Sequence, residues 1–501
     1  MKLSSLLFEG EFSSPYDPQS IEIGGICCAG DRVTDGCLFV CIRGTRYDSH
    51  LLLQKVAAAG AAAALIEDGA DYTAPEGFPV FSVANTRRAL AFACDRFCGR
   101  PTQGMHLIGV TGTNGKTSTA AMIYRILSAS GKSVACIGTV ACKSEQKSYD
   151  RDPATETRTT MTTPDPDILY PMLKSMKEDG IEYVVMEASS HALALDKLAP
   201  LYFDVGIFTN LSPEHLDFHG TMENYLAAKA RLFSQCKYGI LNFDSEYAEK
   251  IAKAAPCRIL RCGAVYHEEY NAEEIRNRGA EGSLYVLSAP GLRLPVSVPI
   301  PGSFSVYNSL LALCCSVTLG ISPTLAAKAL EKMKGVPGRL ERLPLAGAPF
   351  SVFIDYAHTE AALRNLLSTV SHFRRSGERI VLLFGCGGDR DKGKRAPIGR
   401  VAEEYADEII LTSDNSRTEE PIKIIHDILQ GMKNRSKRTV IVNRRRAIEH
   451  AIMNAQAGDI ILLVGKGHET YELVGGERKP FDEKEIVRLS FEKRQKEKGV
   501  L

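Results

Sequence analysis

Apolar and polar positions follow one another differently in three successive stretches of this chain. The first stretch, residues 1–103, has an apolar run at 36–42, an alanine-rich segment at 51–63 and a second apolar run at 64–66. These patterns predict a strand, a helix and a further strand. The turn-forming residues of 99–104 then predict a linker. We expect a small mixed α/β domain over residues 1–103.

From residue 104 onward, short apolar runs alternate regularly with helix-like segments. This alternation is typical of doubly wound, mainly parallel sheets, whose ligands gather at the carboxyl ends of the strands. A turn-rich break at 335–339 separates a central P-loop-type domain, 104–336, from a Rossmann-like α/β domain, 337–501. The predicted central strands are Leu107–Thr111, Val134–Gly138, Tyr183–Glu187, Val205–Thr209 and Tyr238–Asn242. The predicted strands of the last domain are Val352–Asp355, Ile380–Gly385, Glu408–Thr412, Val440–Asn443 and Ile460–Gly465.

The composition argues against several classes of protein. The 501 residues include 61 basic and 60 acidic side chains, a balance that offers no basic surface for nucleic acid. The first ten residues lack the apolar core of a signal sequence, and no apolar run is long enough to span a bilayer. The 14 cysteines include no C-x-x-C pair, which disfavours a zinc site and favours reduced thiols. We expect a cytoplasmic protein, a monomer, without a nucleic-acid or membrane partner.

The segment Gly112–Thr117, Gly-Thr-Asn-Gly-Lys-Thr, lies between an apolar run and a helix-like stretch. A strand, a glycine loop and a helix in this order direct backbone N–H groups toward a phosphate. Lys116 would reach the terminal phosphates of a nucleotide, and the Thr117 hydroxyl would bind Mg²⁺. The usual P-loop pattern has a glycine where this chain has Val110. We therefore predict a nucleoside triphosphate site with an unusual loop.

This loop resembles the ATP loop of the Mur ligase family, whose members join amino acids to peptidoglycan precursors or glutamates to folate. Further segments resemble family motifs in the same order, among them 302–308, 338–341 and 355–358. The resemblance implies ATP as a substrate, with Arg339 offsetting phosphoryl charge, Asp355 at the ribose and His358 near the phosphates. The implied ATP site comprises Gly112, Thr113, Asn114, Gly115, Lys116, Thr117, Ser118, Asn308, Arg339, Asp355 and His358.

Two Mg²⁺ ions are implied by the same resemblance. Glu187 ends a predicted strand facing the glycine loop, where a carboxylate can bind the metal of MgATP. In the family, the lysine of an Ala-Ala-Lys helix is carbamylated by CO₂, and Lys229 matches it. With His215 it would hold the second ion, whereas we interpret His219 as a structural residue. The implied metal ligands are Thr117, Glu187, His215 and Lys229, and the implied catalytic residues are Lys116, Lys229, His215 and Arg339.

Segments 387–395, 414–417 and 465–469 most resemble the branch of the family that adds meso-diaminopimelate. In that branch an arginine pairs with the distal carboxylate of the amino acid, which explains a preference over lysine. Arg417 matches this arginine, and Glu469 would accept a hydrogen bond from the distal amine. Ser416 replaces a family proline, so we expect a looser loop. The implied amino-acid site comprises Arg390, Asp414, Asn415, Ser416, Arg417, Gly465 and Glu469.

The implied site for the UDP-sugar-peptide departs furthest from the family pattern. A family Asp-Ser-Arg is Ala29-Gly30-Asp31 here, and a Gln and an Arg are replaced by Leu195 and Lys197. Thr162, Thr163 and Ser189 match the family. The implied contacts are Gly30, Thr162, Thr163, Ser189 and Lys197.

The resemblance implies an ATP-dependent amide ligase that adds meso-diaminopimelate to the D-glutamate side-chain carboxylate of UDP-MurNAc-L-Ala-D-Glu through an acyl phosphate. Its small-molecule partners would be the UDP-MurNAc-dipeptide and a diamino acid. One alternative is a Mur-type paralogue that adds L-lysine or uses another acceptor, such as a folate-like glutamate. Two further alternatives are a non-catalytic nucleotide-binding scaffold and a mechanical P-loop ATPase. ATP turnover that requires both an acceptor and an amino acid would separate the ligase from these two.

Overall fold

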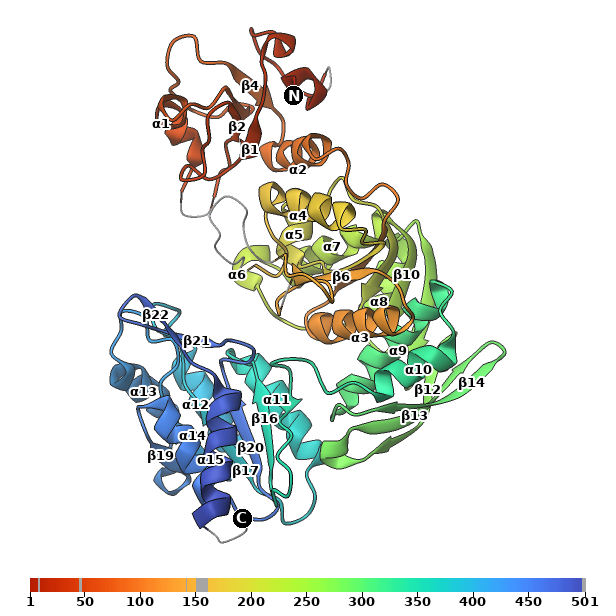
Figure 1. Ribbon diagram of the computed structural model, residues 1–501, viewed down its shortest axis with the longest axis vertical. Coiled ribbons are helices and arrows are strands. Elements are labelled where there is room, and N and C mark those ends of the chain that lie inside the picture. Colours follow the sequence, from red (N-terminus) through yellow and green to blue (C-terminus); the bar gives the residue numbers. More distant parts are fainter. Residues whose placement is uncertain (8–9, 45–46, 141, 150–160, 498–501) are drawn as a thin grey trace. The chain divides into compact units, whose positions relative to one another are not determined.

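The computed structural model describes residues 1–7, 10–44, 47–140, 142–149 and 161–497 (Figure 1). The chain divides into two compact units, Met1–Asn271 with Leu310–Ala326, and Ala272–Ser309 with Ala327–Leu501. The domain boundaries expected near residues 103 and 336 stay predictions. Each unit is organised around parallel strands that are linked mainly by helices.

The first unit begins with a small parallel sheet in the order β1-β2-β3-β4. The predicted helix over 51–63 is shorter in the structure: α1 ends at Ala58, because Gly60 takes a φ of +97° that breaks the helical path. Its last alanine instead begins β3, in which a short apolar run is buried. The elements are β1 (Gly25–Cys27), β2 (Cys37–Val40), α1 (Leu53–Ala58), β3 (Ala63–Glu67), β4 (Val80–Val83) and α2 (Thr86–Phe97).

The central sheet of the first unit has the strand order β11-β10-β9-β5-β8-β6-β7, and all of its pairs are parallel except β6 with β7. Near-continuous apolar runs form its inner strands, as expected where helices cover both faces. Its strands are β5 (His106–Thr111), β6 (Val134–Ile137), β7 (Cys142–Lys143), β8 (Tyr183–Glu187), β9 (Phe203–Phe208), β10 (Cys236–Asn242) and β11 (Arg258–Gly263). Its helices are α3 (Lys116–Ala129), α4 (Pro166–Glu178), α5 (Ser190–Ala194), α6 (Leu216–His219), α7 (Met222–Ala230) and α8 (Ala248–Ala254).

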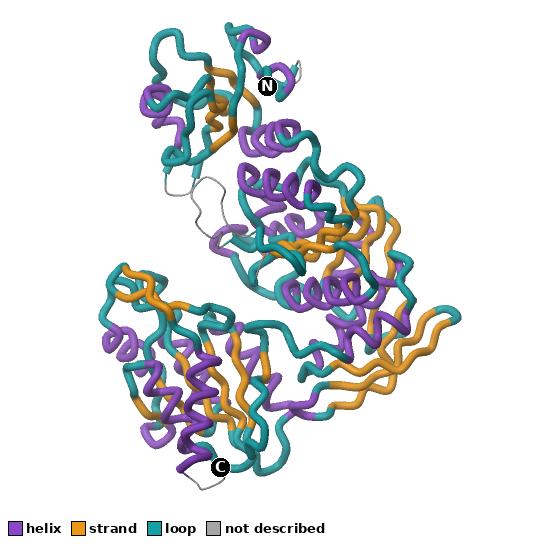
Figure 2. The backbone as a smooth tube through the Cα atoms, in the orientation of Figure 1, coloured by secondary structure: helices purple, strands orange, loops and turns teal. Residues whose placement is uncertain are grey.

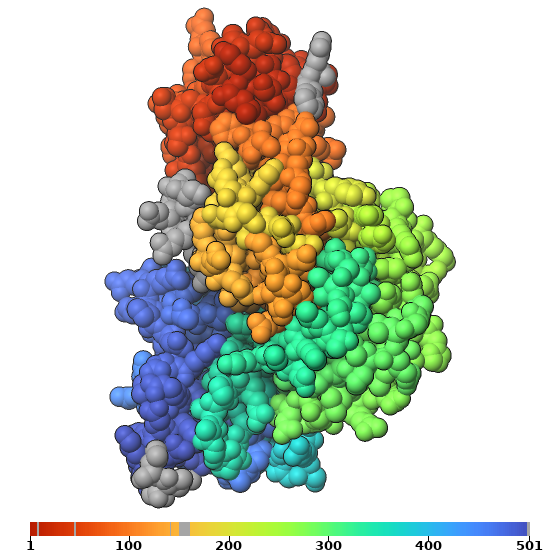
Figure 3. All heavy atoms as spheres, turned by 45° about the vertical axis from the view of Figure 1, so that its right-hand side comes forward, coloured from red at the N-terminus to blue at the C-terminus, as the bar shows by residue number. Residues whose placement is uncertain are grey.

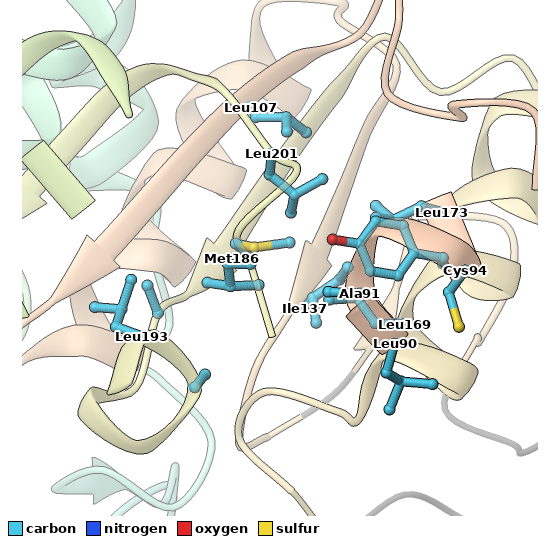
Figure 4. Close-up of a cluster of buried hydrophobic side chains, with 14 of the residues drawn as sticks. Leu90, Ala91, Cys94, Leu107, Ile137, Leu169, Leu173, Met186, Leu193 and Leu201 are labelled. Carbon is cyan, nitrogen blue, oxygen red and sulfur yellow. The ribbon is translucent and has the colours of Figure 1, made fainter. Parts of the chain in front are cut away.

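One apolar core joins the N-terminal region to the central sheet within the first unit. Figure 4 shows Leu90 and Cys94 of α2 close to Leu169 and Leu173 of α4. The same neighbours are visible in Figure 3, where orange atoms of α2 adjoin yellow atoms of α4. Their burial removes apolar surface from water, which is the main favourable contribution to holding the two regions together.

The second unit begins within β12 (Tyr270–Asn277) and contains an antiparallel ribbon that the sequence patterns did not predict. Figure 2 shows this ribbon, β13 (Ser283–Ala289) paired with β14 (Leu292–Val298), and then strands alternating with helices through residues 351–497. A helix pair, α9 (Ser303–Thr318) and α10 (Pro323–Glu331), lies between the two segments in sequence; α9 passes from the second unit into the first, and α10 returns.

The C-terminal sheet has the order β15-β16-β20-β17-β18-β19. Its strands are β15 (Glu341–Arg342), β16 (Ser351–Asp355), β17 (Ile380–Phe384), β18 (Glu408–Leu411), β19 (Arg438–Val440) and β20 (Ile460–Val464), with a separate hairpin of β21 (Tyr471–Val474) and β22 (Glu477–Pro480). The helices are α11 (Glu360–Phe373), α12 (Arg395–Tyr405), α13 (Pro421–Leu429), α14 (Arg444–Asn454) and α15 (Glu483–Glu497). Among the described residues, no helix is both long and apolar enough to cross a bilayer.

Candidate active site

The glycine loop follows β5 and leads directly into α3, as the sequence predicts. Gly112 has a φ of +145°, and a side chain there would overlap the Thr209 hydroxyl, so only glycine fits without displacing its neighbours. The backbone N–H of Thr113 donates to the Asn210 carbonyl at 2.8 Å, and that of Asn114 to the Asn210 side chain at 3.0 Å. These bonds fix the loop against the carboxyl end of β9.

Lys116 is the first residue of α3 and folds back over this loop. Its Nζ donates to the carbonyl of Gly112 at 2.9 Å and to that of Thr113 at 2.8 Å. An ammonium held above a glycine loop at a helix N-terminus is well placed for phosphate oxygens.

Glu187 ends β8 with its side chain buried beside the loop. Its carboxylate accepts hydrogen bonds from the Thr117 hydroxyl at 3.0 Å and from the backbone N–H of Thr139 at 2.8 Å. Three strands therefore meet at this carboxylate, because Thr117 follows β5 and Thr139 follows β6. The sequence predicts Glu187 and Thr117 here, but it does not predict Thr139.

Gly138 leaves the room that the Glu187 carboxylate occupies, since a side chain at Gly138 would overlap Oε1 of Glu187. We expect Gly138→Ala to push this carboxylate aside and to raise the Mg²⁺ concentration needed for ATP turnover about tenfold, with a modest loss of Tm. The measurement is a Mg²⁺ titration of phosphate release. Gly180→Ala is the control for a loss of stability alone. That glycine has a positive φ, so alanine strains the backbone there, but the space around it is open. Equal Mg²⁺ requirements in both variants would contradict the role of Glu187.

Lys229 lies in α7 and is almost completely buried. Its Nζ donates to the carbonyl of Gly112 at 2.8 Å and lies 4.5 Å from the centre of the Tyr225 ring. Burial and the nearby ammonium of Lys116 lower the pKa of Lys229 well below its ordinary value. A lowered pKa increases the fraction of neutral amine, which is the form that reacts with CO₂.

His215 precedes α6 in a left-handed conformation, with a φ of +56°. Its ring and Lys229 lie around the same aromatic side chain, since its centroid is 6.4 Å from that of Tyr225. The His191 ring lies 4.9 Å from His215, and burial lowers the pKa of His191 to about 4. His219 is buried and bonded to the Ser190 hydroxyl at 3.0 Å, which fits the structural role interpreted from the sequence.

The arrangement suits a metal ion that keeps few protein ligands. Among the residues that the structure describes, no group of three His, Cys, Asp or Glu side chains is gathered as a cation site. Mg²⁺ in nucleotide sites commonly takes one or two protein ligands, with phosphate oxygens and waters filling its shell. The buried Glu187 carboxylate beside the Thr117 hydroxyl fits that requirement.

The residues expected at the UDP-sugar-peptide fall into two places. Thr163 donates to the carbonyl of Glu187 at 2.8 Å and to the Ser189 hydroxyl at 3.2 Å, while Thr162 contacts Thr139 at 3.1 Å. Lys197 is nearby, because its Nζ donates to the carbonyl of Thr163 at 3.4 Å. These residues therefore gather at the carboxyl end of β8, and Thr162 is linked to the Glu187 carboxylate through the Thr139 hydroxyl.

Gly30 lies in the N-terminal region, where a side chain would crowd Leu52. Two residues later, Arg32 forms an ion pair at 2.9 Å with Asp167 of α4, and both side chains are largely buried. The pair links the N-terminal region to the central sheet. The sequence comparison did not single out Arg32; an arginine one position beyond the family's Asp-Ser-Arg was the available signal.

The second unit holds the remaining residues of the predicted ATP site. The Asp355 carboxylate ends β16 and accepts from the backbone N–H groups of Leu340 at 2.7 Å and Ala357 at 2.8 Å. The Arg339 guanidinium lies 5.3 Å from the centre of the Tyr356 ring. Burial lowers the pKa of His358, which favours its neutral form. Asn308 is buried in α9.

The predicted amino-acid site is assembled at the carboxyl ends of β18, β17 and β20, which are neighbouring strands. Asn415 donates through Nδ2 to Glu469 at 2.8 Å, although the two residues are far apart in sequence. Gly465 approaches Asp414 so closely that a side chain would crowd the carboxylate at 2.5 Å. Arg390 and Arg417 both lie beside Gly387, although Arg390 is exposed.

Main-chain bonds hold the loop at Ser416 in place, in contrast to the looser loop expected without the proline. The backbone N–H of Arg417 donates to the carbonyl of Leu473 at 2.9 Å, and that of Gly475 donates to the carbonyl of Arg417 at 2.7 Å. The loop is thus bonded to the hairpin on both sides of Arg417. The Arg417 guanidinium donates through Nη1 to the carbonyl of Gly388 at 2.7 Å, which orients it.

Lys466 is a residue of this site that sequence reasoning missed. It is fully buried, and its Nζ donates to Oδ1 of Asn415 at 3.0 Å and to the carbonyl of Tyr471 at 2.9 Å. In the sequence, only its position between Gly465 and Glu469 indicated that Lys466 belongs to the site. That signal was weak, because a single lysine is usually solvated.

Comparisons with known proteins agree with this geometry. The Mur ligase middle domain matches residues 110–316, and the Mur ligase, glutamate ligase domain matches residues 338–467. A relative from Syntrophomonas wolfei, named UDP-N-acetylmuramoyl-L-alanyl-D-glutamate--2,6-diaminopimelate ligase, is 38% identical over 97% of this chain and 98% of its own. A relative from Geobacillus kaustophilus with the same name is 39% identical, over 92% of this chain and 94% of its own.

A solved structure also titled UDP-N-acetylmuramoyl-L-alanyl-D-glutamate--2,6-diaminopimelate ligase is similar, with a TM-score of 0.68 and 28% identity over 99% of both chains. The likeness confirms the expected fold class, with an N-terminal domain, a central ATPase domain and a C-terminal Rossmann-like domain. The two domain matches span the glycine loop, the buried Glu187 and the loop that carries Arg417. The chain belongs to the Mur ligase family.

Proposed function

We propose that this protein is an ATP-dependent amide ligase that joins meso-diaminopimelate to the D-glutamate side-chain carboxylate of UDP-MurNAc-L-Ala-D-Glu. The observation that carries the proposal is the near-full-length identity to relatives that bear this enzyme name. It places the reaction in the synthesis of peptidoglycan precursors.

The reaction has two steps. First, a carboxylate oxygen of the dipeptide forms a bond to the γ-phosphorus of ATP, and ADP leaves. Second, the amine nitrogen of the diamino acid attacks the acyl carbon, phosphate leaves with the C–O bond electrons, and the amine loses a proton. Lys116 and Arg339 would offset negative charge during phosphoryl transfer, which is where preorganised cations contribute most.

The metal and carbamate assignments extend this proposal. Mg²⁺, when bound, would neutralise phosphate charge and hold the transferring group in line. Thr117 and Glu187 would hold one ion, because their oxygens already lie together. Lys229 would react through its neutral amine: its nitrogen forms a bond to the carbon of CO₂ and releases one proton. The resulting carbamate, with His215, would hold a second ion.

The amino-acid preference follows from Arg417 and Glu469. A guanidinium oriented by the Gly388 carbonyl can pair with a carboxylate at the far end of diaminopimelate, whereas lysine lacks that group. Asp414 and Glu469 would accept from the distal ammonium. The departures at Ala29, Gly30 and Asp31 concern the uridine end of the acceptor.

We expect MgATP and UDP-MurNAc-L-Ala-D-Glu to give rapid phosphate release only when meso-diaminopimelate is added. The measurement compares diaminopimelate, L-lysine and L-ornithine at equal concentrations. Release with lysine but not diaminopimelate would keep the ligase and contradict the role of Arg417. No release with any amine would contradict the proposed acceptor.

A further inference from the structure

Lys466 occupies the centre of the amino-acid site without being one of its expected substrate contacts. Beyond its two hydrogen bonds, its Nζ lies 3.6 Å from the Asp414 carboxylate and 4.0 Å from that of Glu469. The Phe481 ring centre lies 5.5 Å away. One buried ammonium therefore contacts three of the residues proposed to bind the diamino acid.

The first effect of the Lys466 ammonium is on the orientation of the Asn415 side-chain amide. Oδ1 of Asn415 accepts from Lys466 at 3.0 Å and from the backbone N–H of Leu473 at 2.9 Å. Both partners can only donate, so the oxygen must face them, and Nδ2 must face Glu469. Removing the ammonium would take away one of the two donors that select this orientation.

The second consequence concerns charge. Asp414 and Glu469, when ionised, place two negative charges in one largely buried site, and two like charges disfavour each other. As an ammonium, Lys466 reduces their sum to one negative charge; burial lowers the pKa of Lys466, and the charge of Asp414 opposes that lowering. The one negative charge that remains would be balanced by the single distal ammonium of the substrate. Burial and Asp414 raise the pKa of Glu469, while Lys466 and the hydrogen bond from Asn415 oppose the rise.

A lysine that only stabilised the fold would not need to contact the residues proposed to bind the substrate. Arg494 shows the contrast: it is buried, and its guanidinium donates to the carbonyls of Ile452 and Ala455, without contact to the proposed substrate residues. Lys466 instead directs its ammonium at Asp414, Asn415 and Glu469. We propose that Lys466 is a positioning residue that orients the Asn415 amide and sets the net charge of the site, so that it accepts the ammonium of the diamino acid.

The inference rests on the proposed function, and a two-part experiment on the full chain tests them separately. Acyl phosphate formation is measured without any amine, by trapping with hydroxylamine in the presence of MgATP and UDP-MurNAc-L-Ala-D-Glu. The KM values for meso-diaminopimelate and for MgATP are then measured for wild type, Lys466→Met, Lys466→Arg and Arg494→Met, together with Tm.

We expect Lys466→Met to trap acyl phosphate at the wild-type rate but to raise the KM for diaminopimelate about tenfold or more, as for a lost hydrogen bond to a charged group. Its KM for MgATP should stay within about twofold. Lys466→Arg keeps the positive charge and should show a smaller, equally selective rise; it carries the test alone if Lys466→Met does not fold. Arg494→Met should lower Tm without a selective change in KM.

Three results would overturn the assignment: unchanged KM for diaminopimelate, equal rises in both KM values, or loss of acyl phosphate trapping in the Lys466 variants alone. Failure of the wild type to trap acyl phosphate would instead count against the proposed function.

Discussion

Replacing Lys229 with alanine should lower kcat about 10³-fold, and acetate or formate should restore part of the lost rate. The loss is of the size expected when a charged group that stabilises the transition state is removed. The rescue follows from the proposed carbamate, because a small carboxylate can occupy the space and supply the same negative charge. The measurement is phosphate release by Lys229→Ala against increasing concentrations of each salt at constant ionic strength.

Lys116→Ala provides the matched comparison, since both lysines donate to the Gly112 carbonyl. Lys116 is expected to act as a cation, so carboxylates should not restore its variant, whereas a small alkylamine can. Rescue of Lys229→Ala by the alkylamine, with no effect of acetate, would show that the residue acts as an amine and would contradict the carbamate.

Arg417→Ala should raise the KM for meso-diaminopimelate about 10²- to 10³-fold and leave the KM for MgATP nearly unchanged. Arg417 is half-buried, and truncating one partner of a hydrogen-bonded charge pair that the bound substrate covers has an effect of this size, because the substrate carboxylate is left unpaired. The preference for diaminopimelate over lysine, as a ratio of kcat/KM values, should fall by a similar factor.

Arg438→Ala is the control for this variant. Arg438 is also half-buried and donates to a backbone carbonyl, that of Met432, but it begins β19 at the amino end of the strand. Both KM values should stay near wild type in Arg438→Ala. Parallel rises for both substrates in Arg417→Ala would mean that Arg417 supports the fold rather than the amino acid.

Much of the fold could be predicted because buried parallel strands are short apolar runs, as in β8 and β17. The helix predicted over 51–63 was too long. The alanines favour a helix locally, but Gly60 ends it and Ala63 pairs within β3 instead. The apolar run at 440–442 predicted a strand at 440–443, but β19 covers Arg438–Val440, because its pairing with β18 begins two residues before that run.

Local motifs predicted the glycine loop and the two segments that carry Arg417 and Glu469. The contacts that complete the site could not be predicted, because they join residues that are distant in the sequence. Thr139 reaches Glu187 only through the order of β6 and β8, and Lys466 reaches Asn415 only through that of β20, β17 and β18. Spacing along one chain contains no information on such pairs.

The bonding of the Arg417 loop to the hairpin also bears on how such a site can change during evolution. The bonds run between main-chain groups, so they do not depend on which side chain stands at Ser416. A proline can therefore be exchanged for serine with the course of the loop preserved. The positions at which one residue type is favoured are instead Gly475 and Gly476, because their φ angles of +62° and +83° favour glycine. Two residues at the tip of the hairpin, outside the proposed amino-acid site, would then restrict sequence drift more strictly than position 416 within it.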